Sequence, residues 1–310
     1  MSKPDVSIII RTLNEERYLP ELLSSIKNQR STFSHEVVLI DSGSTDNTLN
    51  IAGQFGCRIL HISREEFSFG RSLNRACEAA HGAYFVLISG HCIPCNRHWL
   101  QNLVQPLAEG LVQCCYGRQI GGPQTCWSEC QIFAKYFPEE SSIPQQGFYC
   151  NNANSAIAAD TWNHFKFDEE LTGLEDMHFA KRLVADSGLI GYKADASVYH
   201  IHNENWQQVQ RRFEREALAL RQICPEVILR RRDLIRYFSR GVLRDLVAGL
   251  PRTLSPNVFK QIICYRYNQY IGSYRGNHLH KIVTSELRET YFYPTSSKGQ
   301  PLTHKFISKP

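Results

Sequence analysis

The sequence predicts an α/β fold: a mixed, mostly parallel sheet flanked by helices, with an α-helical C-terminal extension. Short apolar runs alternate with helical patterns over the first 90 residues, which favours crossover-connected strands. Polar residues follow the ends of those runs, and Arg-rich helical patterns replace the alternation after about residue 207. The 310 residues are 42% hydrophobic and 21% charged, which allows one core of ordinary size and an appendage.

Strand and helix signals alternate at short intervals in the N-terminal part. Apolar runs rich in β-branched residues predict strands at 6–10, 36–40, 57–61 and 84–88. Helical patterns predict helices between them, at 19–26, 48–55 and 72–80. Sheets assembled in this way bind their ligands at the carboxyl ends of the strands.

The remaining elements divide the chain into three parts. Strands are predicted at 112–116 and 194–202, and a helix begins at Glu175. Arg-rich helices are predicted at 210–222, 230–249 and 258–274. The predicted division is an α/β domain at residues 1–206, a basic helical extension at 207–292 and a polar, extended tail at 293–310.

Charge is distributed unevenly between these parts. Residues 205–310 hold 19 Lys and Arg against 7 Asp and Glu, whereas the other 204 residues hold 16 against 23. The basic part is expected to face something anionic. Nucleic acid is a poor candidate, because the acidic part would repel phosphate and no aromatic and basic recognition motif is present.

The helix predicted at 230–249 has a basic amphipathic profile. Six apolar residues are predicted to share one face: Leu234, Ile235, Phe238, Val242, Leu243 and Leu246. Four arginines lie elsewhere on it: Arg232, Arg236, Arg240 and Arg244. This pattern fits an anionic membrane surface, and it fits equally a solvated helix that packs on its own domain.

The N-terminal residues do not form a secretory signal, and no stretch reaches the roughly 18 apolar residues of a membrane span. We therefore expect a cytoplasmic protein that is peripheral on the inner face of the cytoplasmic membrane. Eleven cysteines at irregular spacing are expected to be reduced thiols. A zinc site is the alternative, and its ligands would be Cys92, Cys95, Cys126 and Cys130.

Six motifs in order resemble those of a known family. They are residues 6–16, 38–48, 69–74, 116–119, 173–176 and 198–202. With these motifs the chain resembles family 2 glycosyltransferases of the GT-A fold, and within that family the bacterial rhamnosyltransferase-like enzymes of polysaccharide assembly. The resemblance covers residues 5–220 and implies that the α/β domain is catalytic.

The resemblance implies a nucleotide site at the strand ends. Asp41 would accept a hydrogen bond from the base, although the same residue type at a turn can simply cap it. The other implied nucleotide contacts are Thr12, Asn14, Glu15, Gly70, Arg71, Asn74 and Gly90. The donor is expected to be a UDP- or dTDP-sugar.

The metal site departs from the family pattern. His91 stands where the family has a metal-binding Asp, and either His200 or His202 matches a late histidine that often completes the site. These residues would hold a divalent cation, Mn²⁺ or Mg²⁺, and imidazole suits Mg²⁺ poorly. The alternative is that no metal is needed and Arg or Lys stabilises the leaving group.

Asp176 is the predicted catalytic base of an inverting transfer, with Glu175 as the second choice; a helix-capping role for Asp176 is the alternative. Asn152 and Asn154 are predicted to bind the glycan or lipid-linked acceptor. The predicted function is therefore inverting glycosyl transfer from a nucleotide sugar in bacterial surface polysaccharide synthesis. A catalytically inactive subunit that binds nucleotide or glycan is the alternative, because the metal-binding Asp is missing.

Overall fold

The computed structural model describes residues 3–249, 255–279 and 285–293, so nearly all of the tail predicted at 293–310 lies outside the described residues. The chain divides into two compact units. The first unit comprises Met1–Ile120, Phe137–Glu170 and Glu175–His200. The second unit comprises Gly121–Tyr136, Leu171–Leu174 and Ile201–Pro310.

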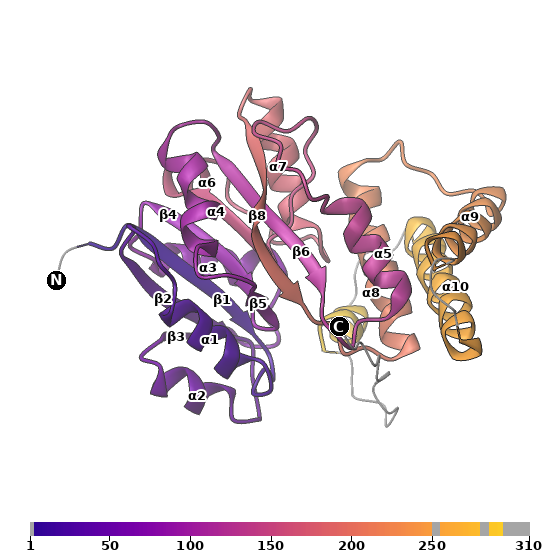
Figure 1. Ribbon diagram of the computed structural model, residues 1–310, viewed down its shortest axis with the longest axis horizontal. Helices are drawn as coiled ribbons and strands as arrows, with labels where there is room; N and C mark the ends of the chain where they lie inside the picture. Colours follow the sequence, from indigo (N-terminus) through magenta and orange to yellow (C-terminus); the bar gives the residue numbers. More distant parts are fainter. Residues whose placement is uncertain (1–2, 250–254, 280–284, 294–310) are drawn as a thin grey trace. The chain divides into compact units, whose positions relative to one another are not determined.

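The first unit is built on an eight-stranded mixed sheet with the order β3-β2-β1-β4-β7-β6-β8-β5 (Figure 1). Its strands are β1 Val6–Thr12, β2 His35–Asp41, β3 Arg58–His61, β4 Tyr84–Ser89, β5 Cys92–Pro94, β6 Cys114–Gly121, β7 Asn154–Ala158 and β8 Ile190–His200. The four strands from β3 to β4 pair in parallel. The pairs β4–β7, β6–β7 and β5–β8 are antiparallel.

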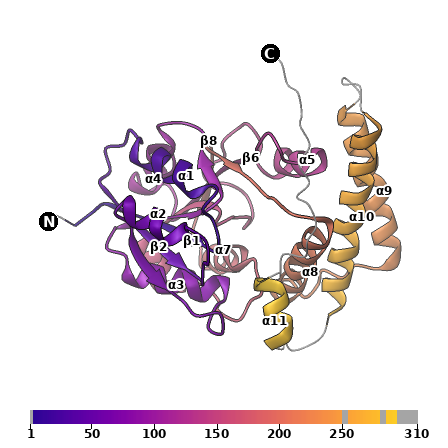
Figure 2. The same ribbon diagram turned by 90° about the horizontal axis from the view of Figure 1, so that it is seen from below.

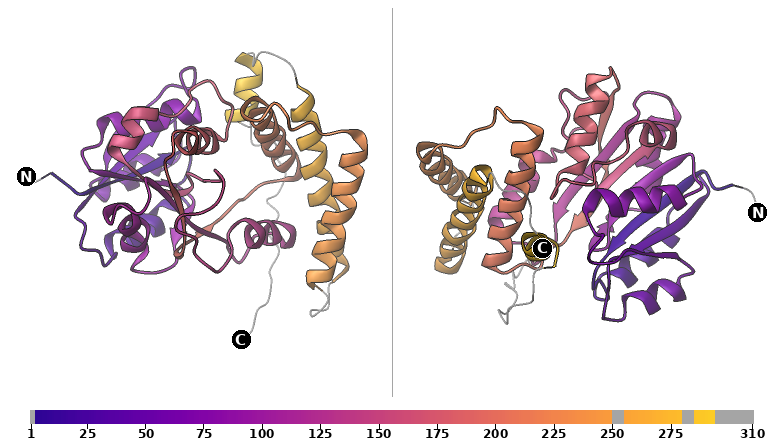
Figure 3. Two further views of the ribbon diagram at one scale, coloured as in Figure 1. Left: turned by 90° about the horizontal axis from the view of Figure 1, so that it is seen from above. Right: turned by 180° about the vertical axis from the view of Figure 1, so that it is seen from behind.

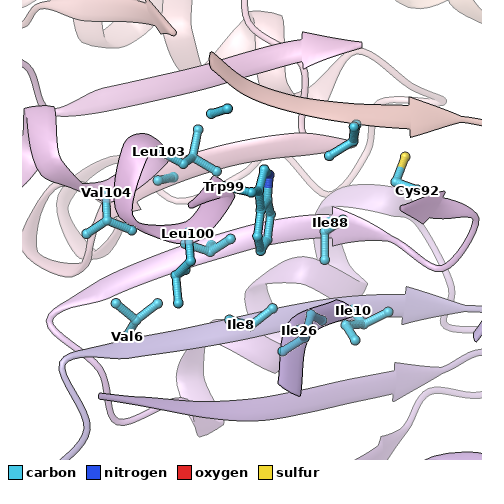
Figure 4. Packing of buried hydrophobic residues seen from close by; sticks show 14 of the residues in the cluster. Val6, Ile8, Ile10, Ile26, Ile88, Cys92, Trp99, Leu100, Leu103 and Val104 are labelled. Atoms are coloured by element: carbon cyan, nitrogen blue, oxygen red, sulfur yellow. The ribbon is translucent and has the colours of Figure 1, made fainter. Parts of the chain in front are cut away.

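Helices cover both faces of this sheet. They are α1 Leu19–Lys27, α2 Thr48–Gln54, α3 Phe69–Ala79, α4 Trp99–Ala108, α6 Ala159–Phe165 and α7 Glu175–Ala185. On one face, α1, α2 and α4 form a core with Ile8 and Ile10 of β1 and Ile88 of β4 (Figure 4). Trp99 is fully buried in that core, and its indole nitrogen donates to Asn154 at 2.9 Å.

The helices α3, α6 and α7 pack on the opposite face. Trp162 of α6 packs edge-on against Phe85 of β4, with the ring centroids 5.4 Å apart. Its indole nitrogen donates to the amide oxygen of Asn74 on α3. Phe179 of α7 contacts both Phe165 and Phe167. Aromatic packing therefore fixes the helix that begins at Glu175 against α6 and the segment that follows it.

The predicted parallel strands and their helices are confirmed, with small shifts at the ends. Helix α3 begins at Phe69 rather than at residue 72, because the Ser68 hydroxyl caps it by accepting from the Arg71 amide. The elements β5, β7, α4, α5, α6 and α11 were not predicted individually. They lie in the antiparallel half of the sheet or after it, where the regular strand and helix alternation stops.

The second unit consists of helices (Figures 2 and 3). They are α5 Trp127–Tyr136, α8 Trp206–Ile223, α9 Arg231–Gly249, α10 Pro256–His278 and α11 Ser285–Phe292. Gly272 and Gly276 of α10 lie against α8, where a Cβ atom at either position would be 2.3 Å or less from a carbonyl oxygen. The helices α8 and α10 are therefore close enough to require glycine at both positions.

Helix α9 is anchored to α10 by a buried ion pair. Asp245 is 0% exposed, and its carboxylate accepts two hydrogen bonds from Arg266 at 2.6 and 2.7 Å. Gly241, one turn earlier, faces Tyr270. Within the predicted apolar face, Ile235 and Leu243 are 67% and 62% exposed, whereas the other four residues, Leu234, Phe238, Val242 and Leu246, are half-buried.

Among the described residues, none of the helices combines the length and the apolar composition needed to cross a membrane.

Candidate active site

Asp41 ends β2 and organises the turn that follows it. The carboxylate is 1% exposed and accepts hydrogen bonds from the amides of Gly43 and Ser44, both at 2.9 Å. The hydroxyls of Ser44 and Thr12 donate to its other oxygen. The turn-forming role that the sequence left open is thus present, and contact between Asp41 and a nucleotide base stays a prediction.

Asn14 ties the loop after β1 to the loop after β2. Its side-chain oxygen accepts from the backbone amide of Thr45 at 2.8 Å. The backbone amide of Asn14 donates to the Ser44 hydroxyl at 2.8 Å. The backbone is left-handed here, with φ of 56°, a conformation that Asn adopts more readily than most residues. Two adjacent strand ends are therefore held as one rigid edge.

Four side chains lie in a row at this edge of the sheet, each within 3.2 Å of the next. Glu15 Oε1 lies 2.7 Å from His91 Nδ1, and His91 Nε2 lies 3.2 Å from His200 Nε2. His200 Nδ1 lies 2.7 Å from Gln119 Oε1. Gln119 also donates from its amide nitrogen to Asn151, which orients its oxygen toward His200.

The partners assign the protons on both imidazoles. A carboxylate and an amide oxygen can only accept, so the Nδ1 atoms of His91 and His200 carry hydrogen. In the neutral rings both Nε2 lone pairs then point at each other across 3.2 Å. Such an arrangement is repulsive unless a cation, either a proton or a metal ion, lies between the two nitrogens.

The donor set of His91 and His200 fits a divalent metal ion. Imidazole nitrogens bind Zn²⁺ at about 2.1 Å, so two of them on one ion at angles near 100° lie roughly 3.2 Å apart. Glu15 and Gln119 supply the outer hydrogen bonds that orient metal-binding histidines. The predicted pairing of His91 with a late histidine thus has the required geometry.

Glu15 and Gly90 act together at this site. Glu15 was predicted to contact the nucleotide, and in the structure its carboxylate holds His91. A Cβ atom on Gly90 would be 2.8 Å from the Glu15 side chain, so only glycine leaves room for that carboxylate to pass. Whether either residue also touches a nucleotide stays a prediction.

His202, the other late histidine, belongs to the second unit. Its Nδ1 atom lies 2.8 Å from Glu129 Oε1. Arg212 donates to the same carboxylate oxygen at 2.7 Å and also pairs with Glu204. This histidine therefore takes part in a buried ionic network of that unit.

Asp176 begins α7 as a buried carboxylate, 7% exposed. It accepts hydrogen bonds from the amides of Asn152 at 2.9 Å and Met177 at 2.7 Å. Burial raises the pKa of Asp176 to about 7, and the neighbouring Glu175 adds to the rise, while the two amides and Arg11 oppose it. A carboxylate that titrates near neutral pH is suited to general-base chemistry.

The two asparagines predicted to bind the acceptor have different surroundings. Asn154 is fully buried: its amide donates to the carbonyls of Arg118 and Ala196 and accepts from Trp99. We therefore correct the assignment of Asn154 from acceptor binding to a structural role, because its side-chain oxygen and nitrogen already form hydrogen bonds within the core. Asn152 lies beside Asp176 and stays a candidate.

Arg71 and Asn74 of α3 are engaged with the segment before α7. Arg71 forms ion pairs with Glu169 at 2.7 Å and Glu170 at 3.2 Å. Asn74 donates to Phe167 and Glu169. A Cβ on Gly70 would be 2.0 Å from the Asp168 carbonyl, so this glycine serves close packing. Nucleotide contacts by these three residues stay predictions.

Contacts within the first unit connect the predicted residues along one edge of the sheet. Thr12 pairs with Asp41 across parallel strands, and the Arg11 carbonyl accepts from the Gly90 amide, next to His91. The Arg11 guanidinium lies 3.7 Å from Glu175, at the start of α7. Arg11 and Gln119 lie in two of the six motifs, 6–16 and 116–119, but were assigned no role there, because their partners Glu175 and His200 are distant in the sequence.

Cysteines do not join the site. All eleven are free thiols, and among the described residues no cysteine belongs to a group with metal-ligand geometry. The zinc alternative is therefore without support. Burial raises the pKa of the Cys92 thiol well above its ordinary value, as expected for a core residue.

Comparison with known proteins agrees with the motifs. Residues 7–157 match the family described as Glycosyl transferase family 2. The O-antigen chain rhamnosyltransferase WbaN of Salmonella anatum is 30% identical over 193 residues, which are 58% of this chain and 61% of that protein. RfbN of Salmonella typhimurium, which has the same description, is 26% identical over 227 residues, 67% of this chain and 70% of that protein. The chain thus matches about three fifths of the length of WbaN.

Solved structures share the fold. A mannosyltransferase, PcManGT from Pyrobaculum calidifontis in complex with GDP-Man and Mn²⁺, has a TM-score of 0.62 at 17% identity and covers 90% of this chain and 88% of its own. Glucosyl-3-phosphoglycerate synthase from Mycobacterium tuberculosis, in complex with Mn²⁺, UDP-glucose and phosphoglyceric acid, has a TM-score of 0.54 at 21% identity and covers 72% and 80%. The predicted GT-A fold is confirmed.

Proposed function

We propose that this chain, which carries a glycosyl transferase family 2 domain in residues 7–157, transfers a sugar from a nucleotide diphosphate, UDP or dTDP, to a hydroxyl of a glycan or lipid-linked acceptor. The proposal includes inversion at the anomeric carbon and a place in bacterial surface polysaccharide synthesis. One observation carries it: Asp176, a buried carboxylate with a pKa of about 7, lies on the sheet edge that also presents the His91–His200 pair. The descriptions of WbaN and RfbN support the pathway.

Asp176 is assigned as the general base. It removes the proton from the acceptor hydroxyl as that oxygen bonds to the anomeric carbon, and the bond from that carbon to the diphosphate oxygen breaks on the opposite face. The proton stays on the Asp176 carboxyl and the nucleoside diphosphate leaves. Glu175 is the second choice, because its carboxylate is engaged by Arg11.

His91 and His200 are assigned as ligands of a divalent cation. When bound, such an ion stabilises the negative charge of the diphosphate leaving group. Two imidazole nitrogens favour Mn²⁺ over Mg²⁺. The Mn²⁺ in the complexes of PcManGT and of glucosyl-3-phosphoglycerate synthase supports the assignment. Asp41, Thr12 and Asn14 are assigned to the nucleotide.

The experiment is a thermal-shift panel with UDP, dTDP, GDP and CMP, each with and without Mn²⁺, followed by turnover of the matching nucleotide sugars. The proposal expects selective stabilisation by one nucleotide, further stabilisation with Mn²⁺, and nucleotide release that Asp176→Asn abolishes. Stabilisation without turnover by the unmodified chain would instead favour the inactive binding subunit.

A membrane-facing role is assigned to the exposed side of α9. Arg232, Arg236, Arg240 and Arg244 recur every four residues on this helix, and all four are exposed. Ile235, Leu243 and Val247 are exposed beside them, at 67%, 62% and 53%. Exposed apolar side chains flanked by arginine fit the boundary between anionic headgroups and acyl chains, where a lipid-linked acceptor would be presented.

Co-sedimentation with vesicles tests this role. Phosphatidylcholine vesicles with and without 30% phosphatidylglycerol would be compared at low and high salt. Each arginine near the surface contributes about 1 kcal/mol, so a triple change of Arg236, Arg240 and Arg244 to Glu should abolish binding. The matched control changes Lys27, Arg30 and Arg97 of the first unit to Glu. Equal loss in both triple variants would refute a specific surface on α9.

A further inference from the structure

Arg11 lies near the end of β1, and its side chain is partly buried, with 23% of it exposed. The guanidinium carbon is 4.3 Å from the centre of the Phe69 ring, and Nη1 is 3.7 Å from Glu175 Oε1. Nη1 is inaccessible to solvent, and among the described residues it forms the ion pair with Glu175 but no hydrogen bond of ordinary length. Burial lowers the pKa of Arg11, and the nearby carboxylates oppose this, so the group keeps its charge.

Asn152 presents a second buried donor beside the same carboxylates. Its backbone amide donates to Asp176 at 2.9 Å, and its side-chain oxygen accepts from the Ser155 hydroxyl at 3.0 Å. These contacts fix the orientation of the side chain. Its Nδ2 atom is buried and has no hydrogen-bond partner within the described part of the chain, and the residue is 7% exposed.

Two unused donors around one carboxylate pair indicate a ligand. Buried donors without acceptors destabilise a fold, and native proteins retain few of them. Because Arg11 Nη1 and Asn152 Nδ2 can only donate, the ligand must offer oxygen acceptors. The charge of Arg11 is already balanced by Glu175 and Asp176, so the site has no excess positive charge to hold a phosphate or carboxylate. Neutral hydroxyl groups fit best.

We propose that Arg11 and Asn152, together with Asp176, form a subsite for a neutral sugar ring. Asp176 accepts a hydrogen bond from one hydroxyl, and Arg11 Nη1 and Asn152 Nδ2 donate to oxygens elsewhere on the same ring. The inference rests on the proposed function, since the hydroxyl that faces Asp176 is then the one that reacts. Arg11 and Asn152 would thus determine which hydroxyl of the acceptor is glycosylated.

The test uses simple sugars as probes, because the natural acceptor is not needed. Methyl glycosides of rhamnose, mannose, galactose and glucose are the neutral probes, and methyl glucuronide and glucose 6-phosphate are the anionic ones. The measurement is nucleotide release from the nucleotide sugar whose nucleotide stabilises the full chain most. Its readout is the probe concentration at which the change in release is half-maximal.

We expect at least one neutral probe to act at lower concentration than either anionic probe. Arg11→Gln and Asn152→Ala should each raise the half-effective concentration of that probe at least about tenfold, as loss of a buried hydrogen bond to a ligand does. Thermal stabilisation by the nucleotide should persist in both variants, which also shows that they fold. The matched control, Arg97→Gln, alters an exposed arginine and should change nothing.

Three results would overturn the subsite while leaving the transferase proposal intact: unchanged probe dependence in both variants, preference for an anionic probe, or no effect of any glycoside on a chain that does release nucleotide. Absence of nucleotide release from every donor would instead count against the proposed function. Probe binding to the same variants, measured by saturation-transfer NMR, would then decide the subsite separately.

Discussion

Folding shifts the pKa values of two buried carboxylates, Asp176 and Glu129, in opposite directions. Both are nearly inaccessible, at 7% and 4% exposure. Burial raises the pKa of Asp176 to about 7, and Glu175 adds to it. Burial also raises the pKa of Glu129, but His202 and Arg212 outweigh it and bring the pKa down to about 2. Burial alone therefore does not decide the ionisation of either group.

The two carboxylates therefore differ in their expected roles: Glu129 contributes to stability, and Asp176 is a candidate for chemistry. Glu129 lies 2.7 Å from Arg212 and 2.8 Å from His202, so its charge supports the helices of the second unit. For Asp176, two backbone amides and Arg11 do not offset burial and the charge of Glu175, so keeping it ionised at neutral pH costs folding free energy. A fold that retains an uncompensated carboxylate is expected to use it.

The largest expected effect is on activity. Asp176→Asn should lower nucleotide-sugar turnover by about 10²–10⁴-fold, because the acceptor proton loses its base. The folded pKa of Asp176 is above its ordinary value of 3.8, so its contribution to stability is present below pH 4 and is lost as pH rises toward 7. The variant should therefore melt no lower than the parent at pH 7–8.

Asp160→Asn is the matched control for that measurement, since Asp160 is an exposed carboxylate in the first turn of α6. It should leave turnover unchanged. Turnover by Asp176→Asn within a few-fold of the parent would remove Asp176 as the base.

The next effect is on stability. Glu129→Gln should lower the free energy of unfolding by about 3 kcal/mol, because it leaves Arg212 and His202 without their shared carboxylate. The folded pKa of Glu129 lies below its ordinary value of 4.5, so its stabilisation is present above that pH and is lost as pH falls toward 2. Urea unfolding at pH 7 and pH 4 measures both statements.

Glu139→Gln is the control here, because Glu139 also pairs with an arginine but its side chain is 83% exposed. Surface pairs contribute little, so this variant should unfold within about 0.5 kcal/mol of the parent. Equal losses of unfolding free energy in the two variants would show that the buried network stabilises the fold no more than a surface ion pair does.

A third prediction separates the two late histidines. Mn²⁺ at a hundred times its dissociation constant should stabilise the parent by about 2.7 kcal/mol. His200→Ala should abolish this stabilisation, whereas His202→Ala should keep it and melt at a lower temperature even without metal, because Glu129 loses a partner. The reverse pattern in a thermal-shift titration with Mn²⁺ would exchange the two roles.

The smallest expected effect is a shift in pH dependence. Because Glu175 raises the pKa of Asp176, Glu175→Gln should move the acid limb of the turnover profile to lower pH. The ratio of turnover at pH 6 to turnover at pH 8 should then be a few-fold higher in this variant than in the parent. Glu170→Gln, whose target carboxylate is 81% exposed, should leave the limb in place. A limb that does not move would mean that another group controls it.

Sequence patterns predicted the parallel half of the sheet well, because apolar runs and helical spacing are local signals. They also pointed to Asp41, His91 and Asp176, since polar residues at strand ends meet at one edge. The antiparallel half was predicted less well, because strands and helices no longer alternate at regular intervals there. For Glu15 the predicted contact with a nucleotide stays open, and its observed partner is His91, 76 residues away.

The fold class, the resemblance to family 2 glycosyltransferases and the residue types at the site could be predicted from the sequence, because each depends on short-range order along the chain. The partner of each side chain became known only from the folded structure. Asn152 and Asn154 look equivalent in the sequence. In the structure, the backbone amide of Asn152 donates to Asp176 and its side-chain nitrogen makes no hydrogen bond among the described residues, whereas the side chain of Asn154 forms hydrogen bonds within the core. The ionisation of a buried group depends on the neighbours that folding brings around it, and these neighbours cannot be predicted from the spacing of residues along the chain.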